Sequence, residues 1–516
     1  MSLADLGKMR LYYTAYAFLL IVQLCPIWFT TYPPLHDYPN HLARTQILHQ
    51  YAENESYRAV YELDWRPLPN LAMDRIVPPL LNVFDIETAS KVFLSLMVVL
   101  FNVGIHVLGA TVHARPHWSA LAASFFTYNY AFAYGFVNYI FGLGMFLITL
   151  ALWLRMRPNW TVGRLLLVSF FALLCYFSHL SSFVFLAVGI ACVTVLDLTQ
   201  TRRFLPPQFL GLVPLVPPLV MYLIYSVGLQ HRGRMEWGPP PLIMKKLAGF
   251  ILYPFLTHDP WIDLVLSAVF CGVILVLLVS RVGRLASKEL LLAASVFVFL
   301  YLIFPTSAAL TSYVDRRFII PAVIMFVLAI HIDASKTIGR YMIIALLTLS
   351  VGRVATVWKV WAGASTAIES QVHALDLLPD GAKVYSMLMY EPGWNSWFRT
   401  APFYFVSHYA TIYRHAFVPT IYAQNGVHPV RLRRSFQTND IQPHRGPRLD
   451  EENWDNDYAW IEQGTPLERV KWSALFSKYD YVWGYGLSED FTRYLLSRGQ
   501  LVARTGEAVL VRVKAG

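Results

Sequence analysis

Long apolar segments alternate with short polar ones over residues 1–357 of the chain. A helix that crosses a membrane needs about 20 mostly apolar residues, and several segments approach that length. The apolar stretch over residues 165–197 is too long for one crossing and is interrupted at Ser178 and His179, so it predicts a helical hairpin. The eleven expected spans are residues 11–30, 88–112, 118–133, 138–154, 165–178, 180–197, 207–228, 262–280, 289–304, 318–332 and 341–357.

The pattern changes to that of a soluble domain at about residue 358. Residues 382–390 and 479–484 have the composition of strands, and Ser488 is a typical N-cap before a helix that Gly499 ends. Residues 501–513 predict a hairpin, whereas residues 391–465 are expected to form long loops. The sequence therefore predicts a transmembrane domain, residues 1–357, with a long first outer loop over residues 31–87. A small α/β domain over residues 358–516 follows.

Composition supports a polytopic α-helical membrane protein. Charged residues make up 14% of the 516 residues and hydrophobic residues 56%, whereas soluble domains carry about 25% charged residues. The net charge is +10, and the excess of Lys and Arg falls in loops on one side of the expected membrane. This asymmetry places the N-terminus in the cytoplasm and residues 358–516 outside, in the periplasm if the membrane is a bacterial inner membrane. The lipid bilayer thus accounts for the charge without a nucleic-acid partner.

A compact group of polar residues begins directly after the first expected span. His36, Asp37, His41 and Arg44 lie within nine residues of one another. If residues 38–50 form a helix, then Asp37, His41 and Arg44 share one face. A carboxylate, an imidazole and a guanidinium would converge there, which favours catalysis or binding. The alternative is that Asp37 is an ordinary N-cap before Pro39.

Further candidates lie in the later outer loops. Asp315, Arg316 and Arg317 precede the tenth expected span, where an arginine could bind phosphate as a bidentate fork. His179 interrupts an apolar run and is expected to face a cavity or a hydrogen-bond partner. Membrane-edge packing and headgroup contact remain alternatives for these groups. The basic residues of the loop after the seventh span suit an anionic ligand; they are Arg232, Arg234, Lys245 and Lys246.

This arrangement resembles the C-superfamily of integral-membrane glycosyltransferases (GT-C), to which protein O-mannosyltransferases and the lipid A aminoarabinose transferase belong. The resemblance covers most of the chain by architecture: a first span, a first outer loop that opens with Asp37, a multi-helix core and an outer α/β domain. By motif it covers Asp37 and the segment Asp315–Phe318. Many relatives have an acidic pair in the first loop, whereas His36 and Tyr38 flank Asp37 here.

The resemblance implies a glycosyltransferase of the cell envelope that uses a polyprenyl-phosphate sugar at the outer face. Asp37, with His41, would act on the acceptor hydroxyl as a base, and the arginines would hold the donor phosphate. One carboxylate opposite a departing phosphate implies inversion. The acceptor would be a glycan, a lipid or a protein.

No cofactor is certain from the sequence. The loop has no Asp-x-Asp metal motif, although His36, Asp37 and His41 could together bind a divalent cation. Two other classes of function stay open. One is a transporter or flippase of lipid-linked glycans, and the other is a non-catalytic glycan assembly factor.

Overall fold

The computed structural model describes residues 3–201, 206–227, 235–237, 242–256, 259–308, 311–390, 401–423, 426–433, 435–436, 459–462, 467 and 472–513. The chain folds into two compact units. The first contains Met1–Phe29, Pro69–Ala72 and Val92–Val360, and the second contains Thr30–Leu68, Met73–Lys91 and Trp361–Gly516.

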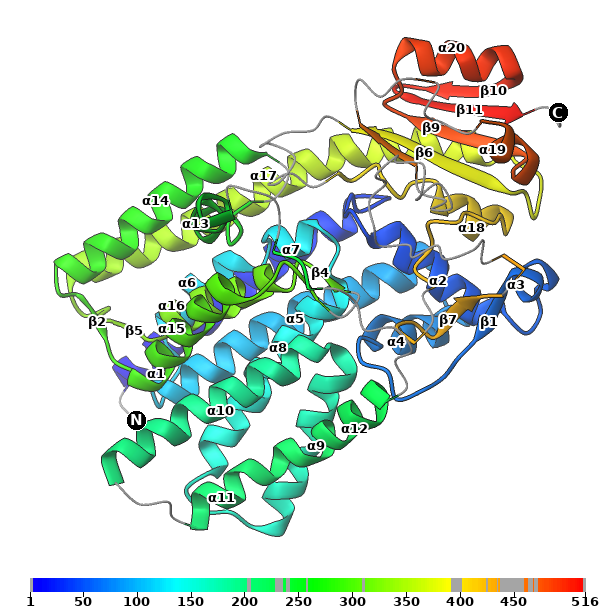
Figure 1. Cartoon of the computed structure of the whole chain (residues 1–516). Helices are drawn as coiled ribbons and strands as arrows, with labels where there is room; N and C mark the ends of the chain where they lie inside the picture. Colours follow the sequence, from blue (N-terminus) through cyan, green and yellow to red (C-terminus); the bar gives the residue numbers. More distant parts are fainter. Residues whose placement is uncertain are drawn as a thin grey trace. The chain divides into compact units, whose positions relative to one another are not determined.

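The first unit is a helical bundle of an integral membrane protein (Figure 1). Within the described residues, seven helices are long and apolar enough to cross a membrane. In the bundle α8 packs against α9 and α10, and α15 packs against α10 and α16. The helices that lie wholly or mainly in this unit are α1 (Leu3–Trp28), α5 (Ile86–Val112), α6 (Trp118–Ala123), η1 (Ser124–Phe126), α7 (Tyr130–Ala133), α8 (Val137–Met156), α9 (Val162–Ser178), α10 (Leu180–Thr201), α11 (Pro206–Leu212), η2 (Val213–Leu215), α12 (Val216–Val227), α13 (Leu242–Leu252), α14 (Pro260–Val279), α15 (Lys288–Ile303), η3 (Asp315–Phe318), α16 (Ile319–Leu328) and α17 (Thr337–Leu375).

At two of the expected spans the structure differs from the prediction. Residues 118–133 form α6, the short turn η1 and α7 instead of one helix. Asn129 begins a new helix here, because its side chain caps α7 and accepts a hydrogen bond from the backbone N–H of Phe132 at 3.1 Å. Residues 318–332 form only the ten-residue helix α16 before strand β5 (Ile330–Ile332), which pairs with β2 (Gly283–Leu285). The predicted hairpin is confirmed, since α9 ends at Ser178 and α10 begins at Leu180.

Close helix packing in the bundle depends on glycine at two positions of α8. A Cβ atom on Gly142 would lie 2.2 Å from Oγ of Ser182, and one on Gly144 would lie 2.7 Å from the backbone of Leu100. Such distances are far below van der Waals contact, so only glycine lets α5 and α10 approach α8 this closely.

The second unit contains most of the first loop and the C-terminal sheet. The five strands lie in the order β10, β11, β9, β6 and β8; β6 runs parallel to β8 and β9, and the other pairs are antiparallel. The predicted strands, the capped helix α20 and the hairpin β10–β11 are present, whereas α18, β7 and β8 replace part of the expected loops. The elements are α2 (Tyr38–Gln50), α3 (Glu55–Val60), β1 (Tyr61–Leu63), α4 (Ala72–Leu80), β6 (Val384–Tyr390), α18 (His408–Arg414), β7 (Val430–Leu432), β8 (Ala459–Glu462), α19 (Trp472–Lys478), β9 (Tyr481–Tyr485), α20 (Glu489–Arg498), β10 (Gly499–Thr505) and β11 (Ala508–Val513).

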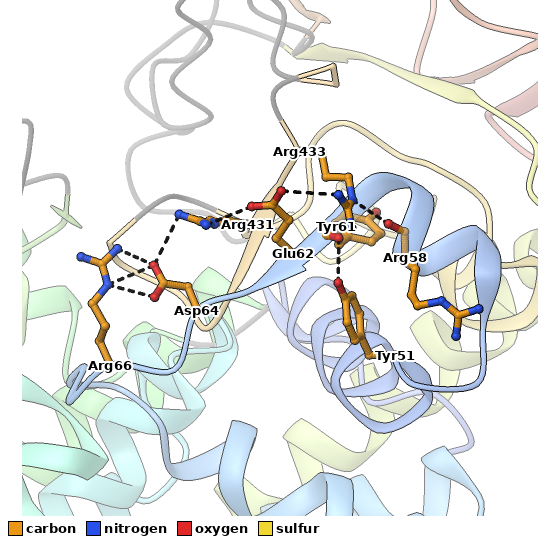
Figure 2. Close-up of polar contacts among 8 residues, drawn as sticks. All are labelled: Tyr51, Arg58, Tyr61, Glu62, Asp64, Arg66, Arg431 and Arg433. Carbon is orange, nitrogen blue, oxygen red and sulfur yellow. Dashed lines mark hydrogen bonds and ion pairs between the residues drawn. The ribbon is translucent and has the colours of Figure 1, made fainter.

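A two-stranded ribbon joins the first loop to the C-terminal segment within this unit (Figure 2). Strand β1 pairs with β7 so that Glu62 lies opposite Arg431, and their side chains form an ion pair at 2.9 Å. Arg433 adds a hydrogen bond from Nε to the carbonyl of Arg58 at 2.6 Å. The half-exposed ion pair of Glu62 with Arg431 contributes little stability. The backbone pairing of β1 with β7 nevertheless fixes the register of the chain that leads to the candidate site.

Candidate functional site

Helix α2 brings the polar residues of the first loop together. It begins after Asp37, and Pro39 stands in its first turn, where the missing N–H of proline costs nothing. Asp37 occupies the N-cap position, but its side chain makes no capping hydrogen bond. The carboxylate is buried and accepts a hydrogen bond of 2.9 Å from the hydroxyl of Tyr422. Asp37 thus stands at the N-cap position that the sequence indicated, but its carboxylate bonds Tyr422 and does not cap the helix.

Asn40 holds the segment that carries this tyrosine. Its side-chain nitrogen donates to the carbonyl of Thr420 at 2.8 Å, and its side-chain oxygen accepts from the backbone N–H of Tyr422 at 2.6 Å. The hydroxyl of Thr420 in turn lies 3.1 Å from Nε2 of the buried residue His408. The NH2 and the C=O of the Asn40 side chain therefore both bond the backbone of residues 420–422. These two bonds hold the segment so that the Tyr422 hydroxyl reaches Asp37.

His36 lies beside the carboxylate. Its Nε2 atom is 3.7 Å from Oδ1 of Asp37, and its Nδ1 accepts a hydrogen bond from the backbone N–H of Ala401 at 3.2 Å. The ring also packs against Tyr404 and Phe405. With Nδ1 as an acceptor, the proton of the neutral imidazole is on Nε2, which faces Asp37.

Arg44 forms a buried ion pair that the sequence did not indicate. Its Nε and Nη2 atoms donate to the two carboxylate oxygens of Asp74 at 2.7 and 3.0 Å, and both side chains are 1% exposed. Nη2 also lies 3.1 Å from Nδ1 of His41, which must accept because arginine only donates. No described residue accepts a hydrogen bond from Nη1 of Arg44, although this atom is buried.

These contacts bear on the expected cation site of His36, Asp37 and His41. The guanidinium of Arg44 faces Nδ1 of His41. Burial, followed by the charge of Arg44, lowers the pKa of His41 well below its usual value. A positive group already occupies one side of this histidine, and within the described residues these three side chains do not form a metal-binding cluster. The geometry thus favours acid–base and hydrogen-bonding roles over metal binding here.

The first unit contains a second polar cluster around Arg316. The buried guanidinium donates from Nη1 to the hydroxyl of Tyr130 at 2.6 Å. It also lies over three tyrosine rings, with its central carbon 4.0 Å from the ring centre of Tyr313, 4.6 Å from Tyr253 and 5.3 Å from Tyr130. Cation–π contacts of this kind hold a positive charge in place without neutralising it.

Asp315 and Lys246 form an ion pair beside this cluster, and the Asp315 carboxylate also accepts the backbone N–H of Arg316 at 2.9 Å. The Lys246 ammonium is 3.3 Å from Oδ2 of Asp315 and donates to the carbonyls of Tyr301 and Phe304 at 2.9 and 2.6 Å. Three partners match the three donors of an ammonium. Lys246 thus holds Asp315, and this arrangement favours a positioning role over direct contact with a ligand.

The remaining predicted residues are spread over the first unit. Arg317 donates to the carbonyl of Ser312 at 3.3 Å and lies over the ring of Phe136. His179 stands at the break between α9 and α10, where its Nδ1 accepts from the backbone N–H of Ser181 at 3.1 Å. This contact gives His179 a capping role. Lys245 is half-buried in α13, and Arg232 and Arg234 lie outside the described residues.

Sequence reasoning missed Asp74, Tyr422 and Tyr130. Asp74 lies 30 positions from Arg44 and Tyr422 lies 385 positions from Asp37, so no local pattern connects them. Tyr130 belongs to an aromatic-rich segment within the span that the sequence predicts over residues 118–133. Only its buried contact with Arg316 distinguishes it from the neighbouring aromatic residues.

Comparison with known proteins identifies the fold of the chain. No family model matches the chain, and no curated protein matches it. Two solved structures of ArnT from Cupriavidus metallidurans are similar over nearly the whole length. The structure bound to undecaprenyl phosphate has a TM-score of 0.54 at 11% identity and covers 98% of each chain. The apo structure has a TM-score of 0.53 at 12% identity and covers 99% of each chain. The predicted GT-C-like membrane fold with a C-terminal α/β region is thereby confirmed.

Proposed function

We propose that this chain, whose fold is that of ArnT, is a membrane glycosyltransferase that moves a sugar from a polyprenyl-phosphate donor to an acceptor. The observation that carries the proposal is the fold shared with an undecaprenyl-phosphate-bound protein over 98% of both chains. Identity of 11% does not transfer a substrate, so the assignment of roles rests on the buried polar clusters of this chain.

Asp37 is the base in this proposal. A general base needs an ionised carboxylate within reach of the proton that it accepts. The hydroxyl of Tyr422 donates to Asp37 at 2.9 Å, which stabilises the charged form through a neutral donor. His36, with Nε2 at 3.7 Å from Oδ1, orients the carboxylate from a second side. His41 lies edge-on to the Tyr422 ring, with ring centres 5.7 Å apart, and supports the phenol rather than the reacting atoms.

Arg316 binds the donor phosphate in this proposal. Its guanidinium is planar, permanently charged and fixed by tyrosine rings and the Tyr130 hydroxyl. A cation held in a water-poor site stabilises charge that develops on a leaving phosphate more strongly than one in water. Arg317, the next residue along η3, is the second candidate for this contact.

The reaction would be a single displacement. The acceptor oxygen attacks the anomeric carbon and loses its proton to Asp37, while the bond from that carbon to the phosphate oxygen breaks. The polyprenyl phosphate leaves with the bonding electron pair, and a cationic group stabilises its charge. One attack from the face opposite the leaving group inverts the configuration of the sugar carbon.

Purified full-length protein tests the proposal. It is incubated in detergent with a polyprenyl-phosphate sugar, and free polyprenyl phosphate is measured. Release that depends on the intact Asp37 carboxylate is the expected result. A protein that moves the donor across vesicles without cleaving it would instead be a transporter or flippase. Binding with neither cleavage nor transport would indicate a non-catalytic assembly factor.

The orientation in the membrane is part of the same proposal. It rests on the charge asymmetry of the loops, which favours an N-terminus in the cytoplasm and, in a bacterial cell, a C-terminal region in the periplasm. A periplasm-dependent reporter fused after Gly516 should be active, and a cytoplasm-dependent reporter at the same position should not. The reverse result would overturn the orientation and place the candidate site on the inner face.

A further inference from the structure

Three histidines of the first unit come together although they are far apart in sequence. His113 directly follows α5, His117 is the N-cap of α6, and His331 is the middle residue of β5. Between the first two, Ala114 has a φ angle of 57°, a left-handed conformation that a residue with a Cβ atom rarely adopts. This turn reverses the chain after α5 so that the His117 ring stacks on the His113 ring, with centres 3.8 Å apart.

The distances suit a metal ion. The ring centre of His331 lies 4.7 Å from that of His117 and 5.6 Å from that of His113. Each histidine offers one ring nitrogen, and the three nitrogens lie within 4.8 Å of one another. Three atoms at that separation are at most about 2.8 Å from a common centre, and Zn–N bonds are about 2.0–2.1 Å. A small inward movement of the rings would therefore complete the coordination.

Hydrogen bonds orient one of the rings as metal ligands are usually oriented. Nε2 of His113 lies 2.9 Å from the carbonyl oxygen of Leu328 and donates to it, which leaves the lone pair on Nδ1. A ring nitrogen that donates to a carbonyl while the other binds the ion is the usual support of a metal-bound histidine. At His117, Nδ1 lies 2.9 Å from Oγ of Ser119 and accepts the backbone N–H of the same residue at 3.3 Å, and Nε2 accepts the backbone N–H of Ile332 at 3.4 Å. An ion bound at His117 would replace one of these contacts.

Charged residues stand near the cluster. Arg115 lies in the turn between His113 and His117, Arg284 lies opposite His331 in the β2–β5 ribbon, and Asp333 follows His331 by two positions. Metal ions bind the neutral form of imidazole. The two arginines oppose an added cation, and they favour an anion or hydroxide at the open position of a bound ion.

We propose that His113, His117 and His331 bind one divalent transition-metal ion, with Zn²⁺ as the preferred occupant. Imidazole nitrogen suits Zn²⁺, Ni²⁺ and Cu²⁺, and three protein ligands with one open position are a common zinc arrangement. The ion joins the turn between α5 and α6 to the β2–β5 ribbon. The site shares no residue with the Asp37 and Arg316 clusters, and it does not depend on the proposed transferase activity.

Cobalt binding tests the site on the full-length protein. The protein is purified in detergent with a tag that contains no histidine, stripped with a chelator and titrated with Co²⁺. Visible absorption typical of four-coordinate Co²⁺, saturating near one ion per chain and abolished by Zn²⁺, is the expected result. Saturation below one half ion per chain, or no absorption, would overturn the proposal.

Variants separate this site from incidental binding. The half-buried ring of His331 makes His331→Asn the mildest change, and it should weaken Co²⁺ binding by more than about tenfold. His331→Cys keeps a ligand and should restore binding with a new thiolate-to-cobalt band. The exposed residue His373 provides the control variant His373→Asn. Equal thermal unfolding of the metal-free variants and metal-free parent checks the fold, and unchanged cobalt binding by His331→Asn would reject the site.

Discussion

Tyrosine side chains stabilise a buried charge in both units. The charge is negative in the Asp37 cluster of the second unit and positive in the Arg316 cluster of the first. Asp37 accepts a hydrogen bond from a tyrosine hydroxyl, and Arg316 donates to a tyrosine hydroxyl and lies over tyrosine rings. Each unit also contains a buried ion pair with one member near the cluster in sequence: Arg44 with Asp74 in the second unit, and Lys246 with Asp315 in the first.

The difference between the two kinds of contact indicates which charges are structural. A carboxylate that receives two N–H bonds from one guanidinium, as Asp74 does, has its charge matched by a full opposite charge. Asp37 instead receives a hydrogen bond from a neutral tyrosine hydroxyl and lies 3.7 Å from Nε2 of His36. We therefore expect changes at Asp37 and Arg316 to affect chemistry more than folding, and changes at Asp74 to do the reverse.

The largest effect on activity is expected for Asp37→Asn. The amide keeps the size of the side chain but cannot accept the acceptor's proton, so turnover should fall by about 10²–10⁴. Donor binding and thermal stability should stay close to those of the parent. Release of polyprenyl phosphate, measured under saturating donor, checks this.

The control is Asp85→Asn. The exposed carboxylate of Asp85 accepts a hydrogen bond of 2.7 Å from the backbone N–H of Thr88, and asparagine caps about as well as aspartate. This variant should be fully active. A folded Asp37→Asn protein with parental turnover would remove Asp37 from the mechanism and leave its hydrogen bond to Tyr422 as a structural feature.

The largest effect on stability is expected for Asp74→Asn. The change leaves the guanidinium of Arg44 buried without its carboxylate, and breaking a buried pair in this way costs about 3–5 kcal/mol. Thermal or denaturant unfolding of the purified protein measures the loss. Asp490→Asn breaks the exposed pair of Asp490 with Arg493, at 3.4 Å, and should have little effect. Equal stability of the two variants would show that the buried pair is not structural.

A smaller effect is expected for Arg316→Lys. Lysine keeps the charge but loses the planar fork and much of the stacking on Tyr313 and Tyr253. Loss of one charged hydrogen bond, about 1.5–3 kcal/mol, should weaken donor binding roughly 10–150-fold. Arg340→Lys, at an exposed arginine that donates to the carbonyl of Ser335, is the control. If donor affinity falls for Arg317→Lys and not for Arg316→Lys, the phosphate contact belongs to Arg317.

Local pattern in the sequence was sufficient to predict helix α2, the α9–α10 hairpin and the α20–β10–β11 segment. In each case a capping residue, a proline or a glycine stands at the boundary, and these residues act within a few positions. The same reasoning failed at residues 118–133. The aromatic residues there resemble a span, but the buried side chain of Asn129 hydrogen-bonds the backbone and begins a new helix.

The candidate site was predicted only on its local side. The spacing of Asp37, His41 and Arg44 indicated one helix face, and α2 provides it. Their principal partners come from elsewhere in the chain, and hydrophobic periodicity contains no information about such pairings. The position of Tyr422 depends on its hydrogen bond to Asn40 and on the β1–β7 ribbon. Both of these contacts form only when the second unit folds.

The smallest effect concerns the pH dependence of the second unit. His408 is buried, its Nδ1 donates to the carbonyl of Phe405 at 3.2 Å, and its Nε2 accepts from the hydroxyl of Thr420 at 3.1 Å. Burial lowers the pKa of His408 to about 3, whereas an unfolded histidine titrates near 6.5. Between these values the unfolded chain binds the proton and the folded chain does not. The contribution of His408 is therefore complete above pH 6.5 and is lost as the pH falls toward 3, by at most about 1.4 kcal/mol per pH unit.

The variant His408→Gln separates this contribution from that of other groups. Glutamine can both donate and accept a hydrogen bond but does not titrate, so thermal unfolding should depend less steeply on pH between 5 and 6.5 than in the parent. His41, whose pKa is also lowered, contributes in the same direction to both proteins and cancels in the comparison. His373→Gln, at an exposed histidine, should keep the parental slope. Equal slopes in the parent and in His408→Gln would show that His408 is not held neutral. Asn40 and the β1–β7 ribbon would then be the contacts that hold the segment carrying Tyr422. The pH dependence of unfolding would give no information about His408.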